Sequence, residues 1–169
     1  MGIFYFPGGE CLYNIGEKIV YPMHGAGIIE AIEEKEILGI MQKYYILKIA
    51  TTNMDIMVPV ATADDIGVRP IIDQSDLCNI FDEIKHYEET DELNWNKRYR
   101  LNLQKIKTGS IVEVGQVIKS LLLRENIKAL STCEKKMLNN ARQIMASEIV
   151  LATGRELEDI ELQIDSLIC

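Results

Sequence analysis

Residues 68–84 read VRPIIDQSDLCNIFDEI, and the spacing of hydrophobic residues changes within this stretch. Its first part, Val68–Ile72, is a candidate strand. Beyond it, apolar residues recur every three or four positions, which predicts an amphipathic helix that Ser75 can cap. The chain is therefore expected to change from a β unit, residues 13–72, to a helical unit, residues 73–169.

The β unit consists of short candidate strands separated by Gly and Pro residues. These strands are 18–21, 28–34, 44–49, 54–60 and 68–72. Residues 25–27 (Gly-Ala-Gly) are expected to form a flexible bend, Gly39 marks a turn, and residues 61–65 form a helical turn. Strands of this length and spacing predict a small, strongly bent antiparallel sheet or barrel. Because its core is thin, the unit is expected to lean on its neighbour.

The helical unit carries clear start signals. Asn94 and Ser110 are expected N-caps, because their side-chain oxygens can accept from free backbone N–H groups of the first turn. Ser131 and Glu134 have the spacing of a capping box. The predicted helices run over 75–87, 95–107, from 110 onward, 131–152 and 156–168. The fold class expected is α+β, with a small sheet followed by a compact helical domain.

Charge is distributed unevenly along the 169 residues. The net charge is −8, yet 11 of the 18 Lys and Arg residues lie between Trp95 and Arg142, opposed there by three Glu residues. The segment before Trp95 holds six basic and seventeen acidic residues. A basic middle in an acidic chain favours two interaction surfaces, of which one suits a polyanion such as nucleic acid. The alternative is that these are ordinary surface cations.

Several protein classes do not fit the composition. The chain is 47% hydrophobic and 26% charged, which is typical of a globular protein. It has no apolar run near the roughly 20 residues that a membrane helix needs, so no membrane partner is expected. Its four cysteines are scattered without metal-ligand spacing, so we expect no metal, no cofactor and free thiols in a cytoplasmic protein.

Candidate catalytic residues are scarce. His24 and His86 are the two histidines, and neither has a partner at suggestive spacing. The Gly-Ala-Gly sequence at 25–27 is not followed by the helix that a phosphate-binding loop requires. We therefore expect no catalytic residues and a protein that is not an enzyme.

Trp95 has two interpretations. It shares a helical face with Tyr99 and Ile106, and this periodicity favours a core anchor. It also occupies the first turn of its helix, beside the most basic cluster, where an aromatic ring could insert at a distorted base step. Sequence spacing leaves both open.

Seven segments together resemble the CarD/CdnL family of bacterial transcription regulators. They are 16–27 (GEKIVYPMHGAG), 32–39, 44–47, 57–60, 94–99 (NWNKRY), 130–131 and 134–138. The likeness covers about Tyr13 to Leu151. The VYP-HG-G and NW--RY elements carry most of its specificity.

The resemblance implies a Tudor-like or SH3-like N-terminal domain that docks on the RNA polymerase β subunit. Lys35 matches a basic polymerase contact of the family, and Met57 stands where a second basic contact is usual. The resemblance also implies a helical domain that touches promoter DNA at the upstream fork of the bubble, with Trp95 as the wedge. The DNA contacts expected from the family and the basic stretch together are Trp95, Lys97, Arg98, Arg100, Lys135 and Lys136.

The expected function is therefore that of a transcription regulator that stabilises the promoter open complex. Its DNA binding should be weak and mainly non-specific, because the net charge of −8 opposes long-range attraction. We expect a cytoplasmic protein that reaches the nucleoid through RNA polymerase. An exposed sheet edge could also give a domain-swapped homodimer. The alternative function is a protein–protein adaptor with no direct DNA role.

Overall fold

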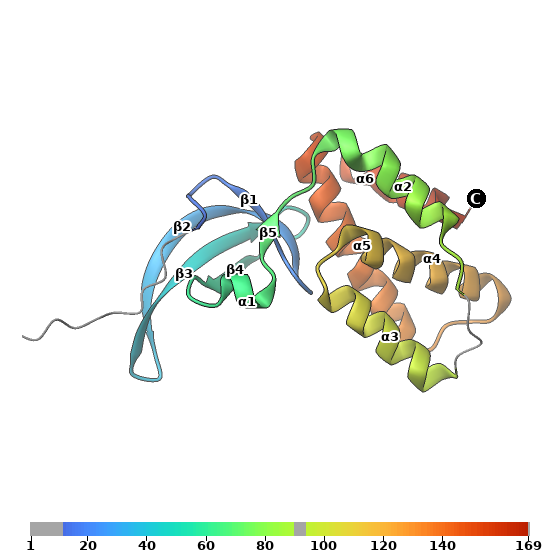
Figure 1. Cartoon of the computed structure of the whole chain (residues 1–169), viewed down its shortest axis with the longest axis horizontal. Helices are drawn as coiled ribbons and strands as arrows, with labels where there is room; N and C mark the ends of the chain where they lie inside the picture. The colour runs from blue at the N-terminus through green and yellow to red at the C-terminus, as the bar shows by residue number, and fades with distance from the viewer. Residues whose placement is uncertain (1–11, 90–93, 169) are drawn as a thin grey trace, which may run out of the picture.

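A computed structural model describes residues 12–89 and 94–168, and it confirms the α+β fold (Figure 1). A five-stranded antiparallel sheet lies beside a helical unit. The strands are β1 (Lys18–Tyr21), β2 (Gly25–Ile37), β3 (Ile40–Ile49), β4 (Asp55–Pro59) and β5 (Arg69–Pro70). Their order in the sheet is β4-β3-β2-β1-β5, so β4 and β5 are its edges. The short helix α1 (Ala63–Ile66) precedes β5.

Strand β2 begins earlier than expected. The prediction of a flexible bend at residues 25–27 is wrong, because these residues pair with β1. Their glycines serve close packing instead. A Cβ atom on Gly27 would lie 2.3 Å from the Lys48 carbonyl oxygen, and one on Gly25 would lie 2.8 Å from the Ser147 hydroxyl oxygen. Only glycine leaves room for the neighbouring strand and helix at these two positions.

Strands β2 and β3 form a long hairpin that projects from the rest of the sheet (Figure 1). Its turn lies at Leu38 and Gly39, which have φ angles of 53° and 77°. Two consecutive positive φ angles match the right-handed twist of a hairpin. A register shift between Ile29 and Ala31 bends the hairpin near its base. Gly39 therefore forms the turn that the sequence predicted.

The helices follow the predicted pattern closely. They are α2 (Leu77–His86), α3 (Trp95–Lys107), α4 (Ile111–Ile127), α5 (Thr132–Thr153) and α6 (Leu157–Asp165), with 3₁₀ turns at Gln74–Asp76 and Ser166–Ile168. Asn94 accepts from the Lys97 N–H at 3.0 Å, and Ser110 accepts from the Glu113 N–H at 3.4 Å. The capping box of Ser131 with Glu134 is also present.

The predicted cap at Ser75 is wrong. Asp73 accepts a hydrogen bond from the Ser75 N–H at 2.9 Å and so caps a 3₁₀ turn, after which α2 begins at Leu77. An aspartate two residues earlier competes for the same backbone donors, and a carboxylate is a stronger acceptor than a hydroxyl.

The sheet leans on the helical unit as expected, through the start of β2 and the second half of α5. The Ala26 N–H donates to the Ser147 hydroxyl at 2.8 Å, and Ser147 is fully buried. Arg69 in β5 donates to both oxygens of Glu148, at 2.6 and 2.9 Å. It also donates to the Gly109 carbonyl at 3.0 and 2.7 Å. These bonds fix the orientation of the sheet relative to the helices.

Candidate nucleic-acid interface

The first turn of α3 presents Trp95 to solvent. Asn94 caps the helix, so its first residue is held in helical geometry at the very end of the element. The indole is 41% exposed and stacks on Tyr99, with ring centroids 5.2 Å apart and planes 16° from parallel. The interpretation of Trp95 as a core anchor is therefore wrong. The ring stands at the surface, and its stack on Tyr99 orients it.

Arg98 lies inside the helical unit rather than on its surface. It is 4% exposed, and its guanidinium donates to the Glu134 carboxylate at 2.9 Å. In this position it faces α5, so it does not present its charge to an external phosphate. The expectation that Arg98 contacts DNA does not fit this geometry. The residue instead joins the first turn of α3 to the first turn of α5.

Glu134 is the centre of this junction. Its carboxylate accepts from the Ser131 N–H at 3.0 Å and the Ser131 hydroxyl at 3.1 Å, and Arg124 approaches to 3.8 Å. Burial raises the pKa of Glu134, but the hydrogen bonds from Arg98 and Ser131 lower it further than burial raises it. The net result is a lowered pKa and a stably charged carboxylate that holds two helix ends together.

Four of the expected DNA contacts are exposed cations around this junction. Lys97 and Arg100 lie on α3, and Lys135 and Lys136 lie near the start of α5. Lys136 faces α3 across a shallow groove whose other side is formed by Tyr99. Lys135 lines a separate depression with Arg142. Tyr99, which stacks on Trp95, thus shares one groove with Lys136, whereas Lys135 lines a different depression.

Other cations of the basic stretch serve the helical unit itself. Lys105 donates to the Tyr87 hydroxyl at 2.8 Å and to Gln116 at 3.1 Å, and lies over the Tyr87 ring. Lys119 is buried and donates to the carbonyls of Lys85 and Tyr87. Arg142 pairs with Asp165. The basic stretch is therefore not one continuous surface.

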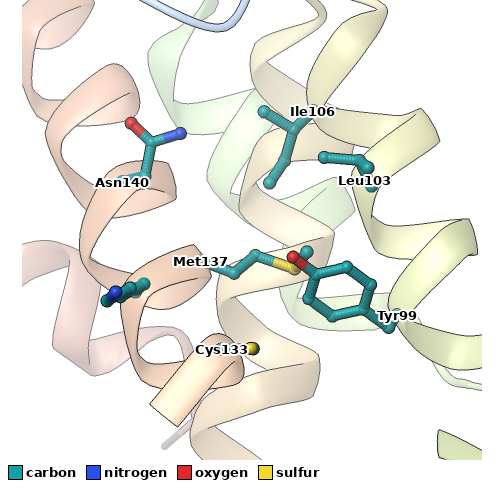
Figure 2. Close-up of a pocket in the computed structure, with 7 residues that line it drawn as sticks. Tyr99, Leu103, Ile106, Cys133, Met137 and Asn140 are labelled. Atoms are coloured by element: carbon teal, nitrogen blue, oxygen red, sulfur yellow. The ribbon is translucent and has the colours of Figure 1, made fainter. Parts of the chain in front are cut away.

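Figure 2 shows the groove between α3 and α5. It has a volume of about 270 Å³. Its lining residues are Tyr99, Leu103, Ile106, Cys133, Lys136, Met137 and Asn140. The walls are mostly apolar, and the polar groups come from Tyr99, Lys136 and Asn140. This groove could not be predicted from sequence patterns, because its two walls are about 35 residues apart along the chain.

Lys35 and Met57, the two expected polymerase contacts, lie on one face of the sheet. Lys35 pairs with Gln42, and Met57 pairs with Ile46. Gln42 and Ile46 are four residues apart on β3, so their side chains point to the same side. The Lys35 side chain is 43% exposed with its Nζ atom 3.3 Å from Glu33, and Met57 is 40% exposed. Both positions are open to a partner.

The far end of the β2–β3 hairpin is apolar and exposed, which sequence reasoning did not use. Ile37, Leu38, Ile40 and Met41 are 41%, 97%, 58% and 54% exposed. The signal was present in the sequence as an apolar run around the Gly39 turn. Exposed apolar side chains in such a cluster are typical of a protein-binding surface.

Among residues 12–89 and 94–168, no cluster of His, Cys, Asp and Glu could hold a metal ion. His24 stacks on Tyr21, and the His86 Nδ1 atom lies 2.7 Å from the Asp82 carbonyl oxygen. No described helix is long and apolar enough to cross a bilayer.

The chain thus combines a sheet that has exposed side chains on one face with a helical unit that presents an exposed indole, and both units match known family models. Residues 13–72 match the family model described as CarD-like/TRCF RID domain, and residues 79–165 match the one described as CarD, C-terminal domain. The chain belongs to this bacterial CarD-like family of transcription regulators.

A relative in Bacillus subtilis (strain 168) carries the name "Putative transcription factor YdeB". It is 43% identical to this chain over 143 residues, which are 85% of this chain and 94% of the relative. The similarity therefore extends over both the sheet and the helices.

Proposed function

We propose that this protein binds the RNA polymerase β subunit through its sheet and stabilises the promoter open complex through its helices. The observation that carries the proposal is the exposed indole of Trp95, which stacks on Tyr99 and lies on the same helix as the exposed Lys97 and Arg100. An aromatic ring in such a setting can wedge between base steps at the upstream fork of the bubble. Reannealing of the strands then requires the indole to leave.

The cations around Trp95 supply attraction to the DNA backbone. Lys97, Arg100 and Lys136 are exposed, so they can neutralise phosphates and release counterions. This contact carries no sequence information, and the acidic remainder of the chain opposes it. Binding to DNA alone is therefore weak, and polymerase binding raises the effective concentration of the helices at the promoter.

The sheet supplies the contact with polymerase. Strand β4 is an edge strand, so its outer backbone groups can pair with a strand of the β subunit. Lys35 and Met57 lie on a face beside that edge and add side-chain contacts. Met57 presents an apolar side chain where the family usually has a basic one. Lys35 therefore supplies the electrostatic contact with polymerase.

Rigid coupling between sheet and helices makes the two contacts cooperate. The Arg69–Glu148 pair and the Ala26–Ser147 hydrogen bond hold β5 and β2 against α5. A rigid connection fixes where Trp95 lies once the sheet has docked, and so limits the entropy lost on DNA contact. No chemical transformation is needed, and we propose a non-enzymatic role in the cytoplasm.

The alternative is an adaptor that binds proteins alone. The exposed apolar end of the β2–β3 hairpin favours protein contact, but it does not explain the exposed Trp95–Tyr99 stack. The two functions differ in their dependence on Trp95. An adaptor tolerates loss of the indole, whereas a stabiliser of the open complex does not.

The test compares Trp95→Ala with Leu123→Ala in an open-complex lifetime assay with polymerase and promoter DNA. Leu123 on α4 is 42% exposed, so it controls for loss of a large exposed side chain of the same exposure. If the indole favours the open state by about 1.4 kcal/mol, its loss changes the open-complex equilibrium constant about tenfold. Equal lifetimes for both variants and the wild type would reject the stabiliser and favour the adaptor.

A further inference from the structure

Tyr99 lines the groove between α3 and α5 (Figure 2), and the same ring stacks on Trp95. Its volume of about 270 Å³ lies just below the range of ordinary ligand sites, which run from roughly 300 to 1,000 Å³. Leu103 and Ile106 from α3 face Met137 from α5, so the interior is apolar. A space of this size and character suits one planar ring better than a larger cofactor.

The polar groups of the groove are available. Among the residues that the structure describes, the side chains of Tyr99, Lys136 and Asn140 make no hydrogen bond or ion pair within the protein. None of the lining residues is acidic. An asparagine amide can form two hydrogen bonds with the edge of a base, and a tyrosine ring can stack on its face. The ammonium group of Lys136 complements the phosphate that accompanies each base.

The groove is continuous with the proposed DNA contact. The Tyr99 ring lies in the groove wall and also stacks on the indole, so the two sites share one side chain. A nucleotide next to the step that the indole occupies would therefore meet the mouth of the groove. Strands that are already melted present such a base at the least cost, because no pairing has to be broken.

We propose that the groove takes one unstacked base of the melted DNA strand, adjacent to the step at which Trp95 inserts. In this arrangement Tyr99 contacts the face of the base, Asn140 contacts its edge, and Lys136 contacts the neighbouring phosphate. The inference rests on the proposed function and adds a second DNA contact to it. It also predicts that the identity or presence of a single base affects the lifetime of the polymerase–promoter complex.

The experiment uses the full chain with polymerase on fork-junction DNA that has a single-stranded extension. An abasic nucleotide replaces each of the first unpaired positions in turn. At one position, the abasic DNA should shorten the lifetime of the wild-type complex about tenfold, the size of one good base contact. Asn140→Ala should shorten the lifetime on intact DNA and remove the sensitivity to the abasic site.

A neighbouring asparagine provides the matched control. Asn139 is exposed and lines the separate depression with Lys135, so Asn139→Ala should behave as the wild type. Leu103→Trp should fill the groove and also abolish the sensitivity. Thermal unfolding confirms that each variant is folded. If Leu103→Trp fails to fold, the comparison of Asn140→Ala with Asn139→Ala tests the base contact by itself.

The failure of this inference differs from the failure of the proposed function. If the abasic site and Asn140→Ala have no effect while Trp95→Ala shortens the lifetime, the groove holds no base. The proposed insertion of Trp95 into DNA is then unaffected. If Trp95→Ala is also without effect, both proposals fall. If Leu103→Trp weakens polymerase binding in the absence of DNA, the groove binds protein and the base contact is rejected.

Thiol modification gives an independent readout. Cys133 lines the groove, whereas Cys78 lies on α2, and both are exposed. Fork-junction DNA in the polymerase complex should slow modification of Cys133 more than fivefold relative to Cys78, as measured peptide by peptide in a mass spectrometer. Equal rates with and without the single-stranded extension would overturn the inference.

Discussion

Replacing Glu134 with glutamine tests the junction that positions α3. The change keeps the size of the side chain and its capacity to serve in a capping box with Ser131, since glutamine occurs at that position of the motif. It removes the negative charge that Arg98 faces at 2.9 Å. The side chains of Arg98 and Glu134 are only 5% and 6% exposed, so water cannot replace the lost charge.

The expected loss in the free energy of unfolding follows from this burial. Removing one partner of a buried ion pair typically costs 3–5 kcal/mol, because the remaining charge is left uncompensated. Arg124, at 3.8 Å from Glu134, adds a second cation to the same place. We expect a loss of at least about 3 kcal/mol, which for a chain of this length lowers the melting temperature by roughly 6–12 °C.

Urea denaturation monitored by circular dichroism measures the change. Glu125→Gln is the matched control, since Glu125 is exposed on the neighbouring helix α4 and should change stability by no more than about 0.5 kcal/mol. The reasoning is refuted if Glu134→Gln costs no more than this control. Such a result would mean that Arg98 leaves the interior at little cost and that the junction does not fix Trp95.

Three further predictions follow from charged contacts elsewhere and from the pKa of Glu134. Glu148→Gln should leave the Arg69 guanidinium without its anion and shorten open-complex lifetimes. The same variant should be retained as well as the wild type in a pull-down with the polymerase β subunit. Weaker retention would contradict the role of this pair in coupling the sheet to the helices. Lys35→Glu should weaken that pull-down at least about tenfold and leave thermal stability unchanged, because the side chain is exposed. Because the folded state lowers the pKa of Glu134, its contribution to stability is complete above the ordinary value of 4.5 and is lost as the pH falls through the lower folded-state value. Acid titration of unfolding should therefore be shallower in Glu134→Gln, and an unchanged slope would contradict the lowered pKa.

Local signals made much of the helical unit predictable. Asn94 and Ser131 act within three residues of their own positions, so the starts of α3 and α5 could be read from the sequence. The same holds for Gly39, whose turn depends on its own backbone conformation. Features of this kind need no knowledge of the distant chain.

Contacts between distant segments could not be predicted in this way. The burial of Arg98 depends on Glu134, which is 36 residues further along the chain. The close packing at Gly25 depends on Ser147 in α5. Helical periodicity placed Trp95 on the buried face, but the first turn of α3 extends beyond the core and leaves the indole half-exposed. Periodicity describes a face and gives no information about where along the helix its neighbour ends.

If the proposed function is correct, residue 95 touches DNA at the upstream fork when the sheet is bound to polymerase. A photo-crosslinking phenylalanine derivative placed at position 95 in the polymerase–promoter complex tests this contact directly, with the same derivative at position 123 as control. We predict crosslinks from position 95 to DNA at the upstream edge of the bubble and none from position 123. Crosslinks from position 95 to protein alone would show that Trp95 is not the DNA wedge.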